Sequence, residues 1–247
     1  MFLIIRNIFK IHVFFYVVMF VCLITGNIRD YLLFVSIVVV HEIGHITGGL
    51  IFSWKIKQVI LLPFGGLTVF NNLVNTSLFE EFVVNLLGPV FQVIFYFFLS
   101  RFFVLSDWIV YYNFALLIFN LLPIYPLDGS KFLYVFLCLF FPFKCAHKCL
   151  VFISFLFIIF VFIYVGHFDL IIFLILFFLF FRVLNEYRNH DYIFNKFLFE
   201  RYNYNFDFRC VRKVSFVNGM YLWCRHLFFV DSNYISERNF LKKWFDK

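Results

Sequence analysis

Long apolar stretches, separated by short segments that carry charge, run through most of this chain. Near-continuous hydrophobicity over about 20 residues is typical of a helix that crosses a bilayer, because a rise of ~1.5 Å per residue then covers the hydrocarbon layer. The pattern therefore predicts six membrane-spanning helices. We place them at residues 11–28, 31–52, 80–102, 107–124 with an extension to about 141, 147–166 and 168–184.

The segment between the second and third predicted spans, residues 53–77, has a different pattern. Apolar and polar residues partly alternate over 53–60, as in a strand, and Pro63-Phe64-Gly65-Gly66 is a strong turn signal. Non-helical backbone is tolerated at membrane depth where protein or a wet cavity satisfies its polar groups. Two interpretations stay open: a short hairpin that dips back against the helices, or an ordinary loop at the membrane surface.

The apolar runs stop near residue 184, and basic residues become frequent after it. Short patterns in this region predict strands at Val211–Val217 and Leu227–Val230 and a helix at Ser236–Phe245. We expect two parts, a six-span membrane domain at 1–184 and a short basic cytoplasmic tail at 185–247.

The composition agrees with a polytopic membrane protein of the all-α class. The chain is 64% hydrophobic with a mean hydropathy of +0.93, whereas soluble domains are about 45–50% apolar. Its net charge of +7 does not indicate a nucleic-acid partner, because the basic residues lie near span ends and in the tail. Arg6 and Lys10 precede the first span, and Lys55 and Lys57 follow the second. The excess of basic residues on the cytoplasmic side then places both termini in the cytoplasm.

The second predicted span contains the sequence His41-Glu42-Ile43-Gly44-His45. On a helix, His41 and His45 are four residues apart and share a face, so two imidazole nitrogens can bind one Zn²⁺. Glu42 stands beside them as a candidate general base for water at the metal. Ionisable groups at this depth are costly and persist mainly where they line a polar cavity or perform chemistry. The alternative is a purely structural role, in which two core histidines form hydrogen bonds with the neighbouring backbone.

A catalytic zinc site needs a third protein ligand, and Asp128 is the candidate. It follows Pro123 and Pro126 and precedes Gly129, so the helix must break just before it. A carboxylate on such an unwound stretch can turn inward, while freed backbone amides and Asn120 can hydrogen-bond a substrate or a developing oxyanion. The alternative is a proline-rich helix break without chemistry.

These two motifs together resemble the site-2 protease family of intramembrane zinc metalloproteases. Further likeness in Phe52–Lys57, Leu61–Gly66, Glu186–Arg188 and Glu200–Tyr202 points to the sporulation branch of that family. The resemblance covers about residues 10–204.

The resemblance implies one Zn²⁺ per chain, bound by His41, His45 and Asp128, with Glu42 as base. It further implies that substrate lies near two groups of residues: Asn120, Pro123 and Pro126, and Phe64, Gly65 and Gly66.

The substrate implied is a membrane-associated pro-sigma factor of the pro-sigma-K type, whose pro-sequence is removed. Other membrane proteins would hold the protease inactive in the bacterial cell membrane, which for this branch is the mother-cell membrane around the forespore. Members of the branch often end in a nucleotide-sensing CBS domain; the tail here is short for one, and a truncated or degenerate CBS-like unit stays open.

Two rival functions remain at this point. The same chemistry could act on an anti-sigma factor or another membrane protein. Alternatively, the chain could be a non-enzymatic metal carrier or a pseudoprotease. A carrier should show polar residues along several spans, and a pseudoprotease should have lost Glu42 or a ligand.

Overall fold

The computed structural model describes residues 9–11, 13–62, 65–71, 73–102, 107–164, 170–208, 210–230 and 233–246. Arg6, Phe64 and the loop between the last two predicted spans fall outside these ranges. The described chain is mostly helical and divides into two compact units. One unit holds 1–72 and 82–121, and the other holds 73–81 and 122–247. The sequence-based division at residue 184 remains a prediction.

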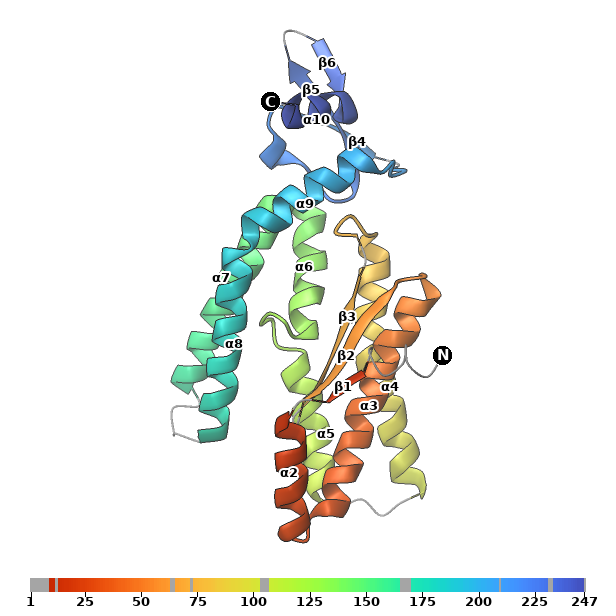
Figure 1. Ribbon diagram of the computed structural model, residues 1–247, viewed down its shortest axis with the longest axis vertical. Helices are drawn as coiled ribbons and strands as arrows, with labels where there is room; N and C mark the ends of the chain where they lie inside the picture. Colours follow the sequence, from red (N-terminus) through yellow and green to blue (C-terminus); the bar gives the residue numbers. More distant parts are fainter. Residues whose placement is uncertain are drawn as a thin grey trace. The chain divides into compact units, whose positions relative to one another are not determined.

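The first unit contains four apolar helices and a small sheet (Figure 1). Its helices are α2 (Val13–Ile24), α3 (Ile28–Ile51), α4 from Phe82 onwards (Leu78–Phe102 in full) and α5 (Asp107–Asn120). Its strands are β1 (Phe9–Ile11), β2 (Ile56–Leu62) and β3 (Gly65–Phe70). Part of the core of this unit is formed by Ile37, Val38, Leu99, Ile109 and Leu116.

A hairpin forms where the sequence pattern changes after the second predicted span. Helix α3 ends in a turn in which Ser53 has a positive φ of 58° and the Trp54 amide donates to the Gly49 carbonyl at 2.7 Å. The chain then reverses into β2, which pairs antiparallel with β3. Strand β1 adds to the other edge of β2 in parallel, and Figure 1 shows the hairpin running beside α3.

The second unit contains helices from the break before Asp128 onwards, together with a second sheet. Its helices are the start of α4 up to Glu81, α6 (Asp128–Phe140), α7 (Phe143–Tyr164), α8 (Leu170–Arg188), α9 (His190–Asn203), the short helix η1 (Val217–Gly219) and α10 (Glu237–Phe245). Its strands are β4 (Cys210–Val214), β5 (Cys224–Val230) and β6 (Asn233–Ser236). Strand β5 lies in the centre, parallel to β4 and antiparallel to β6.

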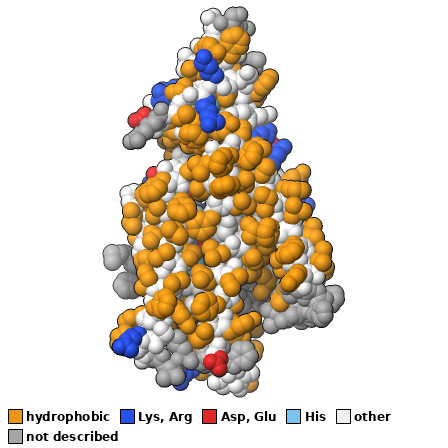
Figure 2. Space-filling model, turned by 180° about the vertical axis from the view of Figure 1, so that it is seen from behind, with side chains coloured by type: hydrophobic (Ala, Val, Ile, Leu, Met, Phe, Trp, Pro, Cys, Tyr) orange, Lys and Arg blue, Asp and Glu red, His pale blue; other side chains and the backbone are white. Residues whose placement is uncertain are grey.

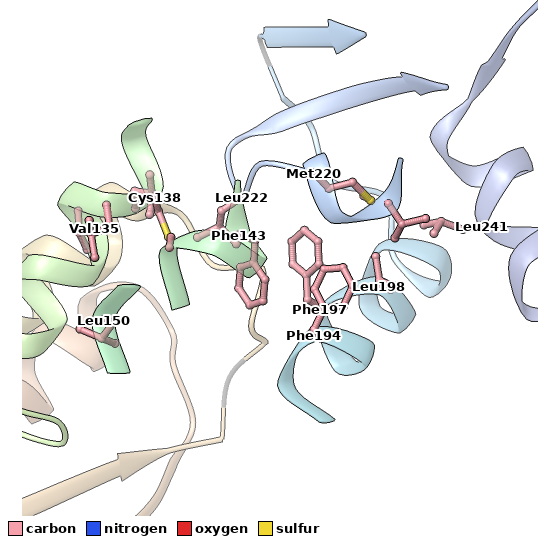
Figure 3. Packing of buried hydrophobic residues seen from close by; sticks show 14 of the residues in the cluster. Val135, Cys138, Phe143, Leu150, Phe194, Phe197, Leu198, Met220, Leu222 and Leu241 are labelled. Atoms are coloured by element: carbon pink, nitrogen blue, oxygen red, sulfur yellow. The ribbon is translucent and has the colours of Figure 1, made fainter. Parts of the chain in front are cut away.

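The core of the second unit is rich in aromatic rings (Figure 3). Phe143 stacks on Phe197 with ring centroids 4.2 Å apart and only 6° between the planes. Met220 and Leu222, which precede β5, are buried in the same cluster. This cluster packs residues of the tail with the beginning of α7.

Three helices in the described chain are long and apolar enough to cross a membrane: α3, α4 and α7. Shorter apolar helices lie at Phe15–Ile24 and Ile109–Asn120. Figure 2 shows hydrophobic side chains over most of the visible face, a surface that suits lipid. The structure thus agrees with a membrane protein, and the count of six spans remains a prediction.

The fourth predicted span is two helices. Helix α5 ends at Asn120 and α6 begins at Asp128, because Pro123 and Pro126 lack the amide protons that a continuous helix would need. The two strands of the hairpin and the tail sheet mean that the chain is not helical throughout.

Candidate active site

The side chains of His41 and His45 converge on the buried face of α3. They are 2% and 3% exposed, and their Nε2 atoms lie 3.1 Å apart. Residues at positions i and i+4 of a helix are stacked one turn apart, so this convergence follows from the local sequence. The motif is a helical one, as the sequence predicts.

The other ring nitrogen of each histidine faces an oxygen that can only accept a hydrogen bond. His41 Nδ1 lies 2.9 Å from Gln92 Oε1, and His45 Nδ1 lies 2.9 Å from the Val84 carbonyl. Both Nδ1 atoms must therefore carry the proton. When both rings are neutral, this leaves each Nε2 atom with a lone pair that faces the other Nε2.

This arrangement fits a metal ion. Two lone pairs in close contact repel unless a cation lies between them, and tetrahedral Zn²⁺ with bonds of about 2.0–2.1 Å holds two nitrogens about 3.3 Å apart. His41, His45 and Asp128 are all buried, and each offers one ligand atom within 4.8 Å of the others. Two imidazoles and a carboxylate form a donor set typical of catalytic zinc.

Glycines let α4 approach α3 closely enough to reach the histidines. A Cβ at Gly44 would collide with the Leu87 carbonyl, and one at Gly48 would lie 2.9 Å from the Val84 Cα. A Cβ at Gly88 would collide with the His45 ring. Small residues in this spacing are typical of closely packed membrane helices. Here the close packing brings the Val84 carbonyl to His45.

Glu42 is 5% exposed and contacts β3 of the hairpin. Thr68 Oγ1 donates to Glu42 Oε2 at 2.7 Å, and a Cβ added to Gly66 would collide with the Glu42 side chain. Gly66 and Thr68 are two residues apart, so both point to the same face of β3. The hairpin therefore contacts the candidate base directly.

Asp128 occupies the first turn of α6, and it is buried. Lys131 Nζ binds its Oδ1 at 3.0 Å. The preceding break holds Pro123 and Pro126 between α5 and α6, and Asn120 is the last residue of α5. Carboxylates are favourable in the first turn of a helix, because the backbone amides there are unpaired and positively polarised.

The remaining predicted residues belong to the hairpin. Gly65 and Gly66 are the first two residues of β3; a Cβ at Gly65 would meet nothing within 4 Å. The predicted substrate role of Phe64 concerns a residue outside the described ranges.

The sequence interpretation missed Gln92, Asn113 and Thr68. Gln92 and Asn113 did carry a signal, since each is a polar residue within an apolar helix, where such residues are costly. Thr68 carried none, because a threonine is ordinary in a strand.

The chain is similar to known proteins in sequence and in fold. No protein-family model matches the chain. Over 207 residues the chain is 35% identical to stage IV sporulation protein FB of Bacillus subtilis (strain 168), a match that spans 79% of this chain and 72% of the relative. Its fold is similar to that of the site-2 protease from Methanocaldococcus jannaschii, with a TM-score of 0.56 and 23% identity over 72% of this chain and 89% of that one. Identity at this level over most of both sequences, together with the shared fold, places the chain in the site-2 protease family of intramembrane metalloproteases, to which stage IV sporulation protein FB belongs.

Proposed function

We propose that this protein is a zinc-dependent endopeptidase that cuts a membrane-associated substrate, with His41, His45 and Asp128 as ligands and Glu42 as general base. The observation that carries the proposal is the convergence of the two Nε2 atoms, 3.1 Å apart, with Asp128, while the opposite nitrogen of each ring faces an oxygen acceptor. A histidine pair that served only to pack the core would not need a buried carboxylate beside both Nε2 atoms.

Zinc at these ligands would polarise the scissile carbonyl and lower the pKa of water at the site. Glu42 takes the proton of the attacking water and passes it to the leaving amine. Thr68 binds Oε2 and so holds the carboxylate in place for this transfer. Asn120 and the backbone amides of the break before Asp128 would hydrogen-bond the substrate carbonyl as negative charge develops there.

The substrate must be extended at the cut, since a helix hides its peptide bonds. Strand β3 lies at an edge of the sheet order β1-β2-β3, so its outer side can accept an added peptide strand. Gly65 and Gly66, at the start of β3, would lie along that path. Pro123 and Pro126 would also shape the substrate path.

The substrate we propose is a sigma factor with an N-terminal pro-sequence, of the pro-sigma-K type. The support is the 35% identity to stage IV sporulation protein FB. By the same likeness, we propose regulatory membrane proteins as partners and a multi-pass location in the bacterial cell membrane, with both termini cytoplasmic. The basic tail, residues 185–247, would lie on the side where a cytoplasmic sigma factor approaches.

The test is co-expression of the full chain with a sigma factor that carries a pro-sequence. Wild type should yield a shortened product, Glu42→Gln should hold metal without cleaving, and Asp128→Asn should lose both metal and activity. Cleavage by Glu42→Gln at the wild-type rate would refute the role of the base. A folded wild type that binds metal but leaves this sigma factor intact would redirect the search to an anti-sigma factor or another membrane protein.

A further inference from the structure

Gln92 is a polar side chain that is completely buried within an apolar helix. It is 0% exposed and lies in α4, one of the candidate membrane spans. A polar group at such a place is costly unless its hydrogen bonds are satisfied, and it often marks a functional site. Both ends of the Gln92 amide are bonded: Oε1 to His41 Nδ1 at 2.9 Å, and Nε2 to Asn113.

Asn113 fixes which way the Gln92 amide points. Gln92 Nε2 donates to the Asn113 backbone carbonyl at 3.0 Å and to Asn113 Oδ1 at 3.1 Å. Asn113 is itself 2% exposed. A flipped Gln92 amide would bring oxygen against oxygen at both contacts, so Oε1 must face His41.

The orientation of the Gln92 amide determines the tautomer of His41, the candidate ligand. With Oε1 as an acceptor at Nδ1, neutral His41 takes the tautomer with the proton on Nδ1 and the lone pair on Nε2. His45 obtains the same tautomer from the Val84 backbone carbonyl, which no side-chain substitution removes. His41 depends instead on a side chain that can be replaced.

We propose that Gln92, oriented by Asn113, is a positioning residue that sets the tautomer and ring orientation of His41 and thereby tightens metal binding. This inference rests on the proposed function, which takes His41 as a zinc ligand. Partners of this kind typically change metal affinity 10–100-fold when they are removed.

Three substitutions separate the role of the Gln92 acceptor from that of the Asn113 side chain. Gln92→Met keeps the length and approximate volume of the side chain but removes the acceptor, and metal affinity should fall about 10–100-fold. Gln92→Glu in its protonated form keeps an acceptor towards His41 and a donor towards Asn113, and should recover most of that loss. Asn113→Leu removes Oδ1 while the backbone carbonyl remains, so its loss should be smaller than that of Gln92→Met.

Thr47→Val is the matched control. Thr47 lies on α3, two residues after His45, and its hydroxyl donates to the Gly44 carbonyl at 2.8 Å. Valine has nearly the same shape without the hydroxyl. This variant should bind metal as wild type does.

The measurement uses the purified full-length protein in lipid nanodiscs, stripped of metal and titrated with Zn²⁺ against a competing chelator. A Co²⁺ titration adds the visible absorption bands of the site, which report ligand geometry independently of cleavage. Wild-type affinity and an unchanged Co²⁺ spectrum in Gln92→Met would overturn the inference. If Gln92→Met does not fold, Gln92→Leu also removes the acceptor, and a folded Gln92→Leu with wild-type affinity and spectrum would overturn the inference instead. A folded wild type that binds neither metal would overturn the proposed function itself, which is a distinguishable result.

Discussion

The hydroxyl of Thr68 donates a hydrogen bond of 2.7 Å to Oε2 of Glu42, although the two residues are 26 positions apart in the sequence. The bond joins the hairpin to the candidate base. It holds the Glu42 carboxylate in one orientation.

Thr68→Val should slow cleavage without loss of metal. A hydrogen bond to a charged group contributes about 1.5–3 kcal/mol, so a loss of roughly tenfold or more in kcat is expected if orientation of Glu42 limits the reaction. Thr68→Ser keeps the hydroxyl and should retain most of the rate. Cleavage rates measured beside zinc content test this. Equal rates for the valine and serine variants would show that the hydroxyl has no part in turnover.

Gly66→Ala should impair cleavage more than Gly65→Ala does. A Cβ at Gly66 collides with the Glu42 side chain, whereas a Cβ at Gly65 has no atom within 4 Å. The collision must displace either the strand or the base. Zinc content should stay at the wild-type level in both variants, because the nearest atoms to a Cβ at Gly66 belong to Glu42 and not to the histidines. The measurement compares the rates at which the two variants cleave the same substrate. Equal losses of rate would contradict the contact between Gly66 and Glu42.

Arg201→Met should destabilise the second unit strongly. Arg201 is 5% exposed and donates to the carbonyls of Cys224 at 2.8 Å and Tyr221 at 3.0 Å. It also pairs with Glu237 at 3.3 Å. Removing one partner of a buried pair costs about 3–5 kcal/mol, since the other charge is left unpaired.

The control for this change is Arg225→Met. Arg225 is exposed and makes one long bond of 3.4 Å, to the Phe206 carbonyl, so its loss should change the free energy of unfolding by less than about 0.5 kcal/mol. Denaturant unfolding followed by tryptophan fluorescence measures both. Similar unfolding midpoints for the two variants would contradict the predicted contribution of Arg201 to the stability of the second unit.

The stability of the protein should fall as the pH drops from about 6.5 towards 4. The pKa of His190 is lowered to about 4, mainly because the side chain is buried. The charges of His147, Lys148 and Lys144 also lower this pKa, whereas Asp191 raises it. Between that value and the ordinary pKa of about 6.5, the unfolded chain binds a proton at His190 that the folded chain does not. Protons therefore favour unfolding in this window, and above it the contribution vanishes.

His190→Gln removes this titration, so its melting temperature should decrease less steeply with pH over the same window. Thermal unfolding in a series of buffers from pH 7.5 to 4 compares the two proteins. Parallel curves for wild type and variant would assign the pH dependence to other groups.

Local sequence determined several features of the fold and the site. The long apolar runs predicted helices α3, α4 and α7, because hydrophobicity over such lengths is a property of the segment itself. The prolines at 123 and 126 predicted the break before Asp128, since each removes a helical hydrogen bond wherever it stands. The spacing of His41 and His45 predicted their convergence, because four residues make about one helical turn.

Contacts between distant segments were decided only by the tertiary structure. Nothing in the short strand β1 indicates that it pairs in parallel with β2, and nothing near Glu42 indicates that Thr68 will bind it. Gln92 and the Val84 carbonyl reach the histidines because glycines on both helices let α3 and α4 pack closely. The sequence by itself thus determined which residues are candidates for the metal and the base, since helix periodicity is local. The groups that orient these residues became known only from the packing, because the backbone approach that brings them together depends on every helix and strand around the site.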